Sequence, residues 1–233
     1  MEVSREGVQK LVSLDEGDGG KGNVKDIVDE LRKTAPTDPE GAQQRAWTLI
    51  KNLGSQLSKD RDTAMNSLAE LFAHGDKPSG LDGPTVGALV GWTAQPIADR
   101  AMSTITSLWL PWVGKRFDAQ DNSGDNLMEG VVRVLGRLVW PIYKFKSYGD
   151  KTSGFGFKTW TEPGKLDPST EVLVIDYKSV PSNPKFLIRS IRDELVQLVP
   201  GVYLGKMLWR SQKGSQERHT LLAYFALKSD LVK

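Results

Sequence analysis

The string at residues 109–118 (WLPWVGKRFD) brings two cations and several aromatic rings close together. Lys115 and Arg116 are adjacent and stand between Trp112 and Phe117. Two such cations can bind a carboxylate or phosphate group by charge-assisted hydrogen bonds, while the rings contact an apolar body. A basic turn on the protein surface would have the same composition. The string supplies four candidate ligand-binding residues: Trp112, Lys115, Arg116 and Phe117.

Three further side chains could move protons if the chain is an enzyme. Asp118 ends the string above, and Asp176 and Tyr177 begin the string DYKSVP at residues 176–181. A carboxylate or phenol that faces an apolar cavity can donate a proton to a bound substrate or accept one from it. Asp118, Asp176 and Tyr177 are therefore the candidate catalytic residues, and Tyr177 is also a candidate ligand-binding residue.

Several familiar catalytic and cofactor motifs are missing from the sequence. It contains no GxxxxGK[ST] loop, no GxGxxG string after a predicted strand, no GxSxG elbow and no HExxH string. The chain has no cysteine and only two histidines, which excludes thiolate sites and multi-histidine metal centres. His74 stands at a predicted helix end, and His219 could act as an acid, a base or a haem ligand if it faced a pocket. We expect a function that needs no metal and no cofactor.

Composition and charge describe an ordinary globular protein. Of 233 residues, 39% are hydrophobic and 26% are charged, and the formal net charge is only +2. A nucleic-acid-binding protein usually has a larger or more clustered basic excess. The N-terminal segment has no apolar signal region, and the most apolar stretch, residues 131–143, is interrupted by arginine, glycine and proline. We expect a cytoplasmic protein that binds no nucleic acid and has no transmembrane segment.

Large aromatic side chains recur on the predicted strands, close to glycine. Six of the seven tryptophans lie after residue 91, and Trp92 directly follows a glycine. On a later strand, Tyr203, Gly205, Met207 and Trp209 share one face. Rings beside missing side chains are what a shaped apolar cavity requires, although a tightly filled core would show the same alternation. The candidate ligand-binding residues on these strands are Trp92, Tyr203, Met207 and Trp209.

The hydrophobic pattern changes from helical to strand-like near residues 76–83 (DKPSGLDG), which are rich in turn-forming residues. Before this turn the pattern predicts two or three amphipathic helices, one of them capped by Asp38 with Pro39 as its first residue. The pattern then predicts strands at 86–93, 154–160, 171–178, 203–209 and 220–228, and helices at 97–108, 127–138 and 183–195. The predicted organisation is a mobile segment at 1–23, a helical region at 24–75 and a β-barrel domain with an apolar pocket at 76–233.

Four short strings resemble those of a group of small bacterial calycin-like β-barrels that is named for a GXWXG motif. They are WVGKRFD at residues 112–118, DYKSVP at 176–181, LGKM at 204–207 and YFALK at 224–228, and their order matches that of the group. Gly87, Gly91 and Trp92 stand at the place of the naming motif, without its W-x-G spacing, and the N-terminal helices have no counterpart in the group. The resemblance implies a barrel that holds a small hydrophobic molecule.

The sequence as a whole predicts an α+β protein that is mainly β. We expect an antiparallel calycin-like β-barrel with short helical insertions, preceded by amphipathic N-terminal helices. A cone of helices on a curved sheet is the alternative architecture. Two functions remain open: binding of a lipid, isoprenoid or aromatic metabolite inside the barrel, or a cofactor-independent cyclase or isomerase that acts on a hydrophobic natural-product intermediate in the same pocket.

Overall fold

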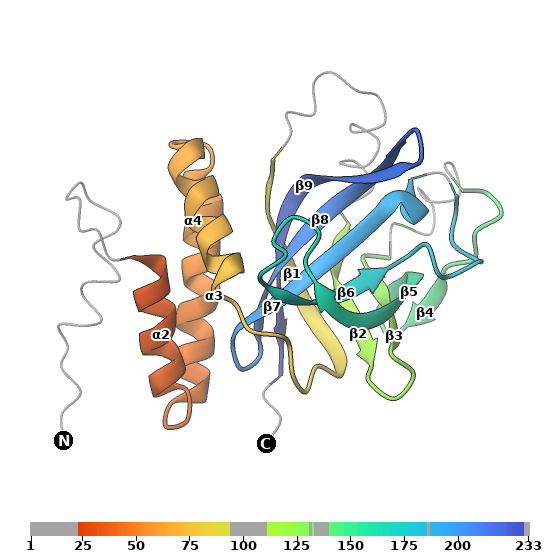
Figure 1. Ribbon diagram of the computed structural model, residues 1–233. Coiled ribbons are helices and arrows are strands. Elements are labelled where there is room, and N and C mark those ends of the chain that lie inside the picture. Colours follow the sequence, from red (N-terminus) through yellow and green to blue (C-terminus); the bar gives the residue numbers. More distant parts are fainter. Residues whose placement is uncertain (1–22, 94–110, 131, 133–139, 186, 231–233) are drawn as a thin grey trace.

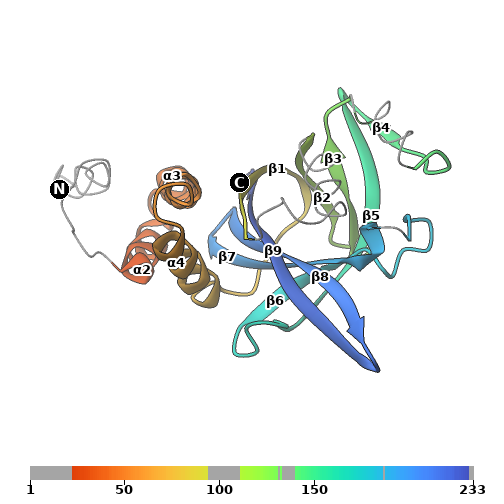
Figure 2. The ribbon, with the colours of Figure 1, turned by 90° about the horizontal axis from the view of Figure 1, so that it is seen from above.

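A computed structural model describes residues 23–93, 111–130, 132, 140–185 and 187–230 of the chain. Helices α2 (Val24–Thr34), α3 (Pro39–Gln56) and α4 (Arg61–Ala73) stand beside a β-barrel (Figure 1), and the view from above shows them grouped on one side of it (Figure 2). The predicted helix at residues 97–108 and most of the one at 127–138 lie outside the described residues, whereas Leu127 and Met128 end a strand.

The barrel is an up-and-down arrangement of antiparallel strands. Within the described residues, neighbours follow the chain order, β3 pairs with β5, and β9 pairs back with β1. These pairings close eight strands into a ring, and β4 is a short addition that pairs with β5. The strands are β1 (Gly83–Trp92), β2 (Trp112–Asp118), β3 (Ser123–Met128), β4 (Lys146–Tyr148), β5 (Lys151–Pro163), β6 (Glu171–Asp176), β7 (Ile191–Val199), β8 (Val202–Lys213) and β9 (Gln216–Ser229). The predicted calycin-like, mainly β architecture is confirmed.

Helices α2, α3 and α4 precede the barrel in the sequence. Each begins after a side chain that accepts a hydrogen bond from a backbone N–H of the first turn: Asn23, Asp38 and Asp60. Pro39 follows Asp38 as the sequence predicts, because the fixed φ of proline suits the first helical position. Helix α4 ends at His74, whose Nε2 lies 2.7 Å from Asp29 Oδ1 on α2.

Apolar side chains pack in two separate layers. One layer fills the barrel interior, and the other lies between the helices and the outer face of β6 to β9. The buried strand residues of the outer layer are Val172, Val174, Val196, Leu198, Val199, Val202, Leu204, Tyr224 and Ala226. As a result, β6 to β9 are buried on both faces where the helices cover them.

Residues 183–195, where the pattern predicts a helix, instead form a short 3-10 turn (η2, Ile188–Ser190) and the first half of β7. Leu187 has a φ of 66°, which interrupts any helix at this point. In β7, Asp193 faces the barrel interior and its neighbour Arg192 faces outward, and both are buried. Because charged residues stand on both buried faces, the strand lacks the alternation of apolar and polar residues from which strands are predicted.

A cluster of charged side chains joins β5 to β7 on the outer face. Arg192 lies between two carboxylates, with Nη2 2.8 Å from Glu162 Oε1 and Nε 2.8 Å from Glu194 Oε1. Burial alone would raise the pKa of Glu162. Hydrogen bonds from Trp160 and Lys165 and the charge of Arg192 outweigh burial and lower this pKa to about 2. Glu162 is therefore ionised at neutral pH.

Acid should remove the stabilisation that Glu162 provides. A carboxyl group whose pKa is lower in the folded than in the unfolded chain stabilises the fold above its ordinary pKa of 4.5 and loses this effect as the pH falls toward 2. We expect Glu162→Gln to flatten the acid dependence of the free energy of unfolding between these two values, as measured by urea unfolding. Glu171→Gln, at an exposed position on β6, is the control. Identical pH profiles for wild type and Glu162→Gln would contradict this prediction.

Removal of the helices should leave a folded but self-associating barrel. A chain comprising residues 76–233 keeps all nine strands but exposes the apolar outer face of β6 to β9, which α2 to α4 otherwise cover. We expect its circular dichroism to show β-sheet and its mass in solution to exceed that of a monomer. Loss of the β-sheet signal would show that the barrel cannot fold without the helices.

Candidate functional site

An ion pair crosses the interior of the barrel. Lys115 of β2 places its Nζ 2.8 Å from Oδ2 of Asp193 on β7, and both side chains are fully buried. Strands β2 and β7 lie on opposite sides of the ring, since β1, β9 and β8 separate them on one side and β3, β5 and β6 on the other. The Lys115–Asp193 pair therefore connects opposite walls through the middle of the barrel.

Hydrogen bonds use all three protons of the Lys115 ammonium group. Besides Asp193, Nζ contacts Oδ1 of Asn126 at 2.8 Å and Oη of Tyr177 at 2.5 Å. Tyr177 in turn donates to Asp193 Oδ2 over 2.9 Å, and Trp112 Nε1 donates to Asn126 Oδ1 over 3.2 Å. A buried charge needs this degree of pairing, because removal from water costs several kcal/mol. We call these five residues the interior polar network.

Aromatic rings surround the Lys115 ammonium group. Its Nζ lies 5.3 to 5.5 Å from the ring centroids of Trp112, Phe157, Tyr177 and Phe225. The negative face of an aromatic ring attracts a cation, and the attraction increases where water is excluded. These rings add to the stabilisation that Asp193 gives to the charged lysine.

Burial shifts the protonation equilibria of the interior polar network. Burial lowers the pKa of Lys115, and the nearby charge of Asp193 acts in the opposite direction. For Tyr177, burial and the charge of Asp193 both raise the pKa well above its ordinary value. Tyr177 is therefore a protonated phenol at neutral pH and can act as a hydrogen-bond donor.

Rings fill the space that two glycines leave in the barrel wall. A Cβ atom at Gly87 would lie 2.4 Å from the Trp112 ring, and one at Gly205 would lie 2.2 Å from the Phe225 ring. These two rings also contact each other edge to face, with centroids 5.7 Å apart. At these positions the alternation of glycine and aromatic residues produces a packed core, which is the second of the two interpretations of the sequence.

One end of the barrel presents large rings that are only partly buried. They are Trp92 on β1 and Trp209 on β8, and both pack against the interior cluster. Trp92 pairs with Ala223 of β9, which also pairs with Met207 of β8, so Trp92 is in register with Met207, two residues before Trp209. We call this part of the molecule the aromatic end.

The structure brings most of the predicted ligand-binding residues together. Trp112, Lys115, Phe117, Tyr177, Tyr203 and Met207 are buried in the barrel interior, and Trp92 and Trp209 lie at the aromatic end. Two partners of Lys115, Asn126 and Asp193, were not among the predicted site residues. Both stand on strands other than that of Lys115, and no local string marks either of them.

Three predicted site residues face away from the interior. Arg116 follows Lys115 on β2 and so points to the opposite face, where it lies 2.5 Å from Asp125 and over the Tyr148 ring. Asp118 accepts backbone hydrogen bonds at the end of the strand. Asp176 pairs in the sheet with the outward-facing Arg192 and contacts Arg210. The two adjacent cations of the GKRF string therefore point to opposite faces of the sheet.

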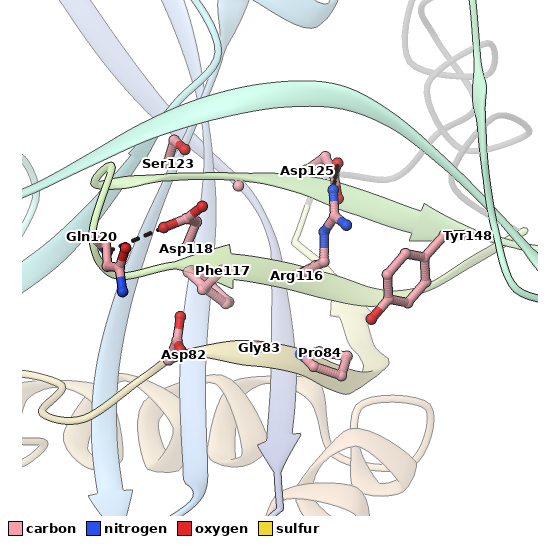
Figure 3. Close-up of a pocket in the computed structure, with 11 residues that line it drawn as sticks. Asp82, Gly83, Pro84, Arg116, Phe117, Asp118, Gln120, Ser123, Asp125 and Tyr148 are labelled. Atoms are coloured by element: carbon pink, nitrogen blue, oxygen red, sulfur yellow. Dashed lines mark hydrogen bonds and ion pairs between the residues drawn. The ribbon is translucent and has the colours of Figure 1, made fainter.

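A groove of about 480 Å³ lies on the outer face of β1, β2 and β3 (Figure 3). Its lining includes Asp82, Arg116, Asp118, Asp125 and Tyr148, and Figure 3 shows the Arg116 guanidinium group beside the Asp125 carboxylate. Arg116 is engaged by Asp125, and Asp118 is engaged by the backbone of the following turn. The charged groups of this groove thus stabilise the local structure.

Metal ligands and membrane-spanning helices do not occur in the described part of the chain. These residues contain no group of three or more His, Cys, Asp or Glu side chains that could hold a metal ion. Among the helices of the same residues, none is long and apolar enough to cross a membrane. Comparison with family models, with curated proteins and with solved structures gave no significant match to this chain.

Removal of the lysine from the interior polar network should destabilise the fold strongly. We expect Lys115→Met to lower the free energy of unfolding by about 3–5 kcal/mol, because Asp193 would remain as an unpaired buried charge. Arg116→Met is the matched control on the same strand, and its partly exposed pair should contribute about 1 kcal/mol or less. Urea unfolding measures both. Equal stabilities of the two variants would show that the buried pair contributes no more than the partly exposed one.

Proposed function

We propose that the barrel binds a small hydrophobic molecule, such as a lipid, an isoprenoid or an aromatic metabolite, at its aromatic end. The observation that carries the proposal is the position of Trp92 and Trp209, which contact the interior cluster but stay partly exposed. Such rings offer a large apolar contact area and lose little conformational entropy when they contact a ligand.

The position of the Lys115–Asp193 pair limits the size of the ligand that the barrel interior would accept. It crosses the middle of the barrel, so a molecule that enters at the aromatic end meets charged groups at this level. An apolar body would bind between Trp209 and the pair, and displacement of the pair would cost the full penalty of two unpaired buried charges.

Membership of the GXWXG-type calycin-like group is part of the same proposal. The WVGKRFD and DYKSVP strings, which carry the resemblance, supply Lys115 and Tyr177, and these two side chains meet in the barrel interior at 2.5 Å. A shared interior contact gives a physical reason for the two strings to occur together in one chain.

A cofactor-independent cyclase or isomerase is the second candidate function. Tyr177 is the residue that would serve it, because a phenol inside an apolar barrel can donate a hydrogen bond to a reacting carbonyl group once that group replaces Asp193 as its acceptor. Asp118 and Asp176 do not support it, since their side chains face away from the interior. Loss of turnover in Tyr177→Phe, with binding retained, would distinguish the enzyme from the carrier.

Truncation of a ring at the aromatic end should weaken ligand binding. We expect Trp209→Ala to weaken the affinity for the neutral fluorophore N-phenylnaphthylamine about tenfold or more, because the contact area of one large apolar side chain is lost. Trp160→Ala is the matched control, since Trp160 stands on the outer face of β5 and is 37% exposed. A fluorescence titration of both variants and the wild type measures the effect.

Two results would contradict the proposal. One is a folded wild-type protein that binds no apolar probe and releases no small molecule on organic extraction, as followed by native mass spectrometry. The other is an equal loss of affinity in Trp160→Ala and Trp209→Ala, which would place the probe on the outer surface.

A further inference from the structure

The interior polar network leaves an acceptor, not a donor, for a further molecule. Lys115 uses its three protons, Tyr177 donates to Asp193 Oδ2, and Asn126 Nδ2 donates to the Phe155 carbonyl oxygen and to Tyr177. By contrast, Asp193 Oδ1 is buried and has no hydrogen-bond partner among the described residues. A buried carboxylate oxygen without a partner carries a free-energy cost that an incoming donor would remove.

Asp193 lies close to the aromatic end. On β7, Asp193 pairs with Met207 of β8, and Ile191, two residues earlier, pairs with Trp209. Two residues of a strand span about 7 Å, so Asp193 stands one layer of side chains below Trp209. Ile175, Ile191, Leu195 and Met207 surround Asp193 on the inner wall. A charged acceptor thus stands within an apolar wall, one layer below the partly exposed Trp209 ring.

We infer that the ligand of the barrel is a hydrophobic molecule that ends in a hydrogen-bond donor, a hydroxyl group above all, which binds to Asp193 Oδ1. This inference rests on the proposed function and adds the polar chemistry of the ligand. The apolar body lies against the rings of the aromatic end, and the hydroxyl group reaches the carboxylate below them. The bond formed is charge-assisted, which makes it about twice as strong as a bond between neutral groups.

The same arrangement selects against carboxylic acids. A ligand carboxylate would approach the negative charge of Asp193, and Lys115 has no proton left to offer it. The sequence pattern suggested that Lys115 and Arg116 bind an acidic ligand end. In the folded barrel Lys115 has a different role, because it neutralises Asp193 and fixes the direction of its second oxygen.

Three probes with one chain length and different ends test the inference. Dodecanol, dodecyl methyl ether and dodecanoate each displace bound N-phenylnaphthylamine, and the displacement gives their affinities. We expect dodecanol to bind about ten- to a hundredfold more tightly than the ether, because only the alcohol can donate to Asp193. Trp140 Nε1 is an interior donor without a partner among the described residues. It can donate a hydrogen bond to the oxygen of dodecanol and of the ether alike, so it does not alter the ratio of their affinities.

Asp193→Asn places an amide of the same shape in the network, and Asp125→Asn is the control at the outward-facing partner of Arg116. In Asp193→Asn we expect the preference for alcohol over ether to fall to about threefold or less, because the charged acceptor is lost. In Asp125→Asn we expect it to be unchanged. If Asp193→Asn does not fold, the ratio of the affinities of the wild type for dodecanol and dodecyl methyl ether tests the inference without the variant.

The outcomes separate this inference from the proposed function. Equal binding of alcohol and ether, or tightest binding of dodecanoate, overturns the inference and leaves hydrophobic binding in place. A preference for alcohol that persists unchanged in folded Asp193→Asn overturns it as well. Failure of every probe to bind the folded wild type overturns both proposals.

Discussion

The Lys115–Asp193 ion pair is the interaction on which the barrel interior depends. It joins strands on opposite sides of the ring, and every other member of the interior polar network is oriented toward it. Two well-packed apolar side chains would often be as stable as such a pair. We interpret the pair as a feature that specifies the register of the strands. A one-residue shift of β2 or β7 would move the charged side chain of that strand to the opposite face of the barrel wall.

The two sides of the barrel differ in how they are protected from water. The helices cover β6 to β9, so these strands are apolar on the outer face as well as the inner one. Across the barrel, β2 and β3 carry polar and charged residues on their outer face, including the Arg116–Asp125 pair. One chain thus contains strands of both kinds, fully buried and half buried, and each has its own sequence pattern.

Elements that are determined by neighbouring residues are predictable from the sequence, whereas a strand whose buried charges pair with other strands is harder to predict. The helices are predictable because their caps are local, as at Asp38 and Pro39. Strand β8 is predictable because Tyr203, Gly205, Met207 and Trp209 share one face. Strand β7 is not, because the partner of Asp193 lies on β2 and one partner of Arg192 lies on β5. The same holds for the site: local strings identify the rings and Lys115, whereas Asp193 is 78 residues away in the sequence and only the folded barrel brings it near.

The order of the elements along the chain has a consequence for how the protein is made. Helices α2 to α4 leave the ribosome first, but the strands against which they pack, β6 to β9, follow only after β1 to β5. The barrel itself closes only when β9 pairs with β1. At about 5–20 residues per second, the roughly 150 residues between α4 and the end of β9 take about 8–30 s to synthesise. During this time the apolar faces of the helices are uncovered on the nascent chain, and such surface promotes aggregation.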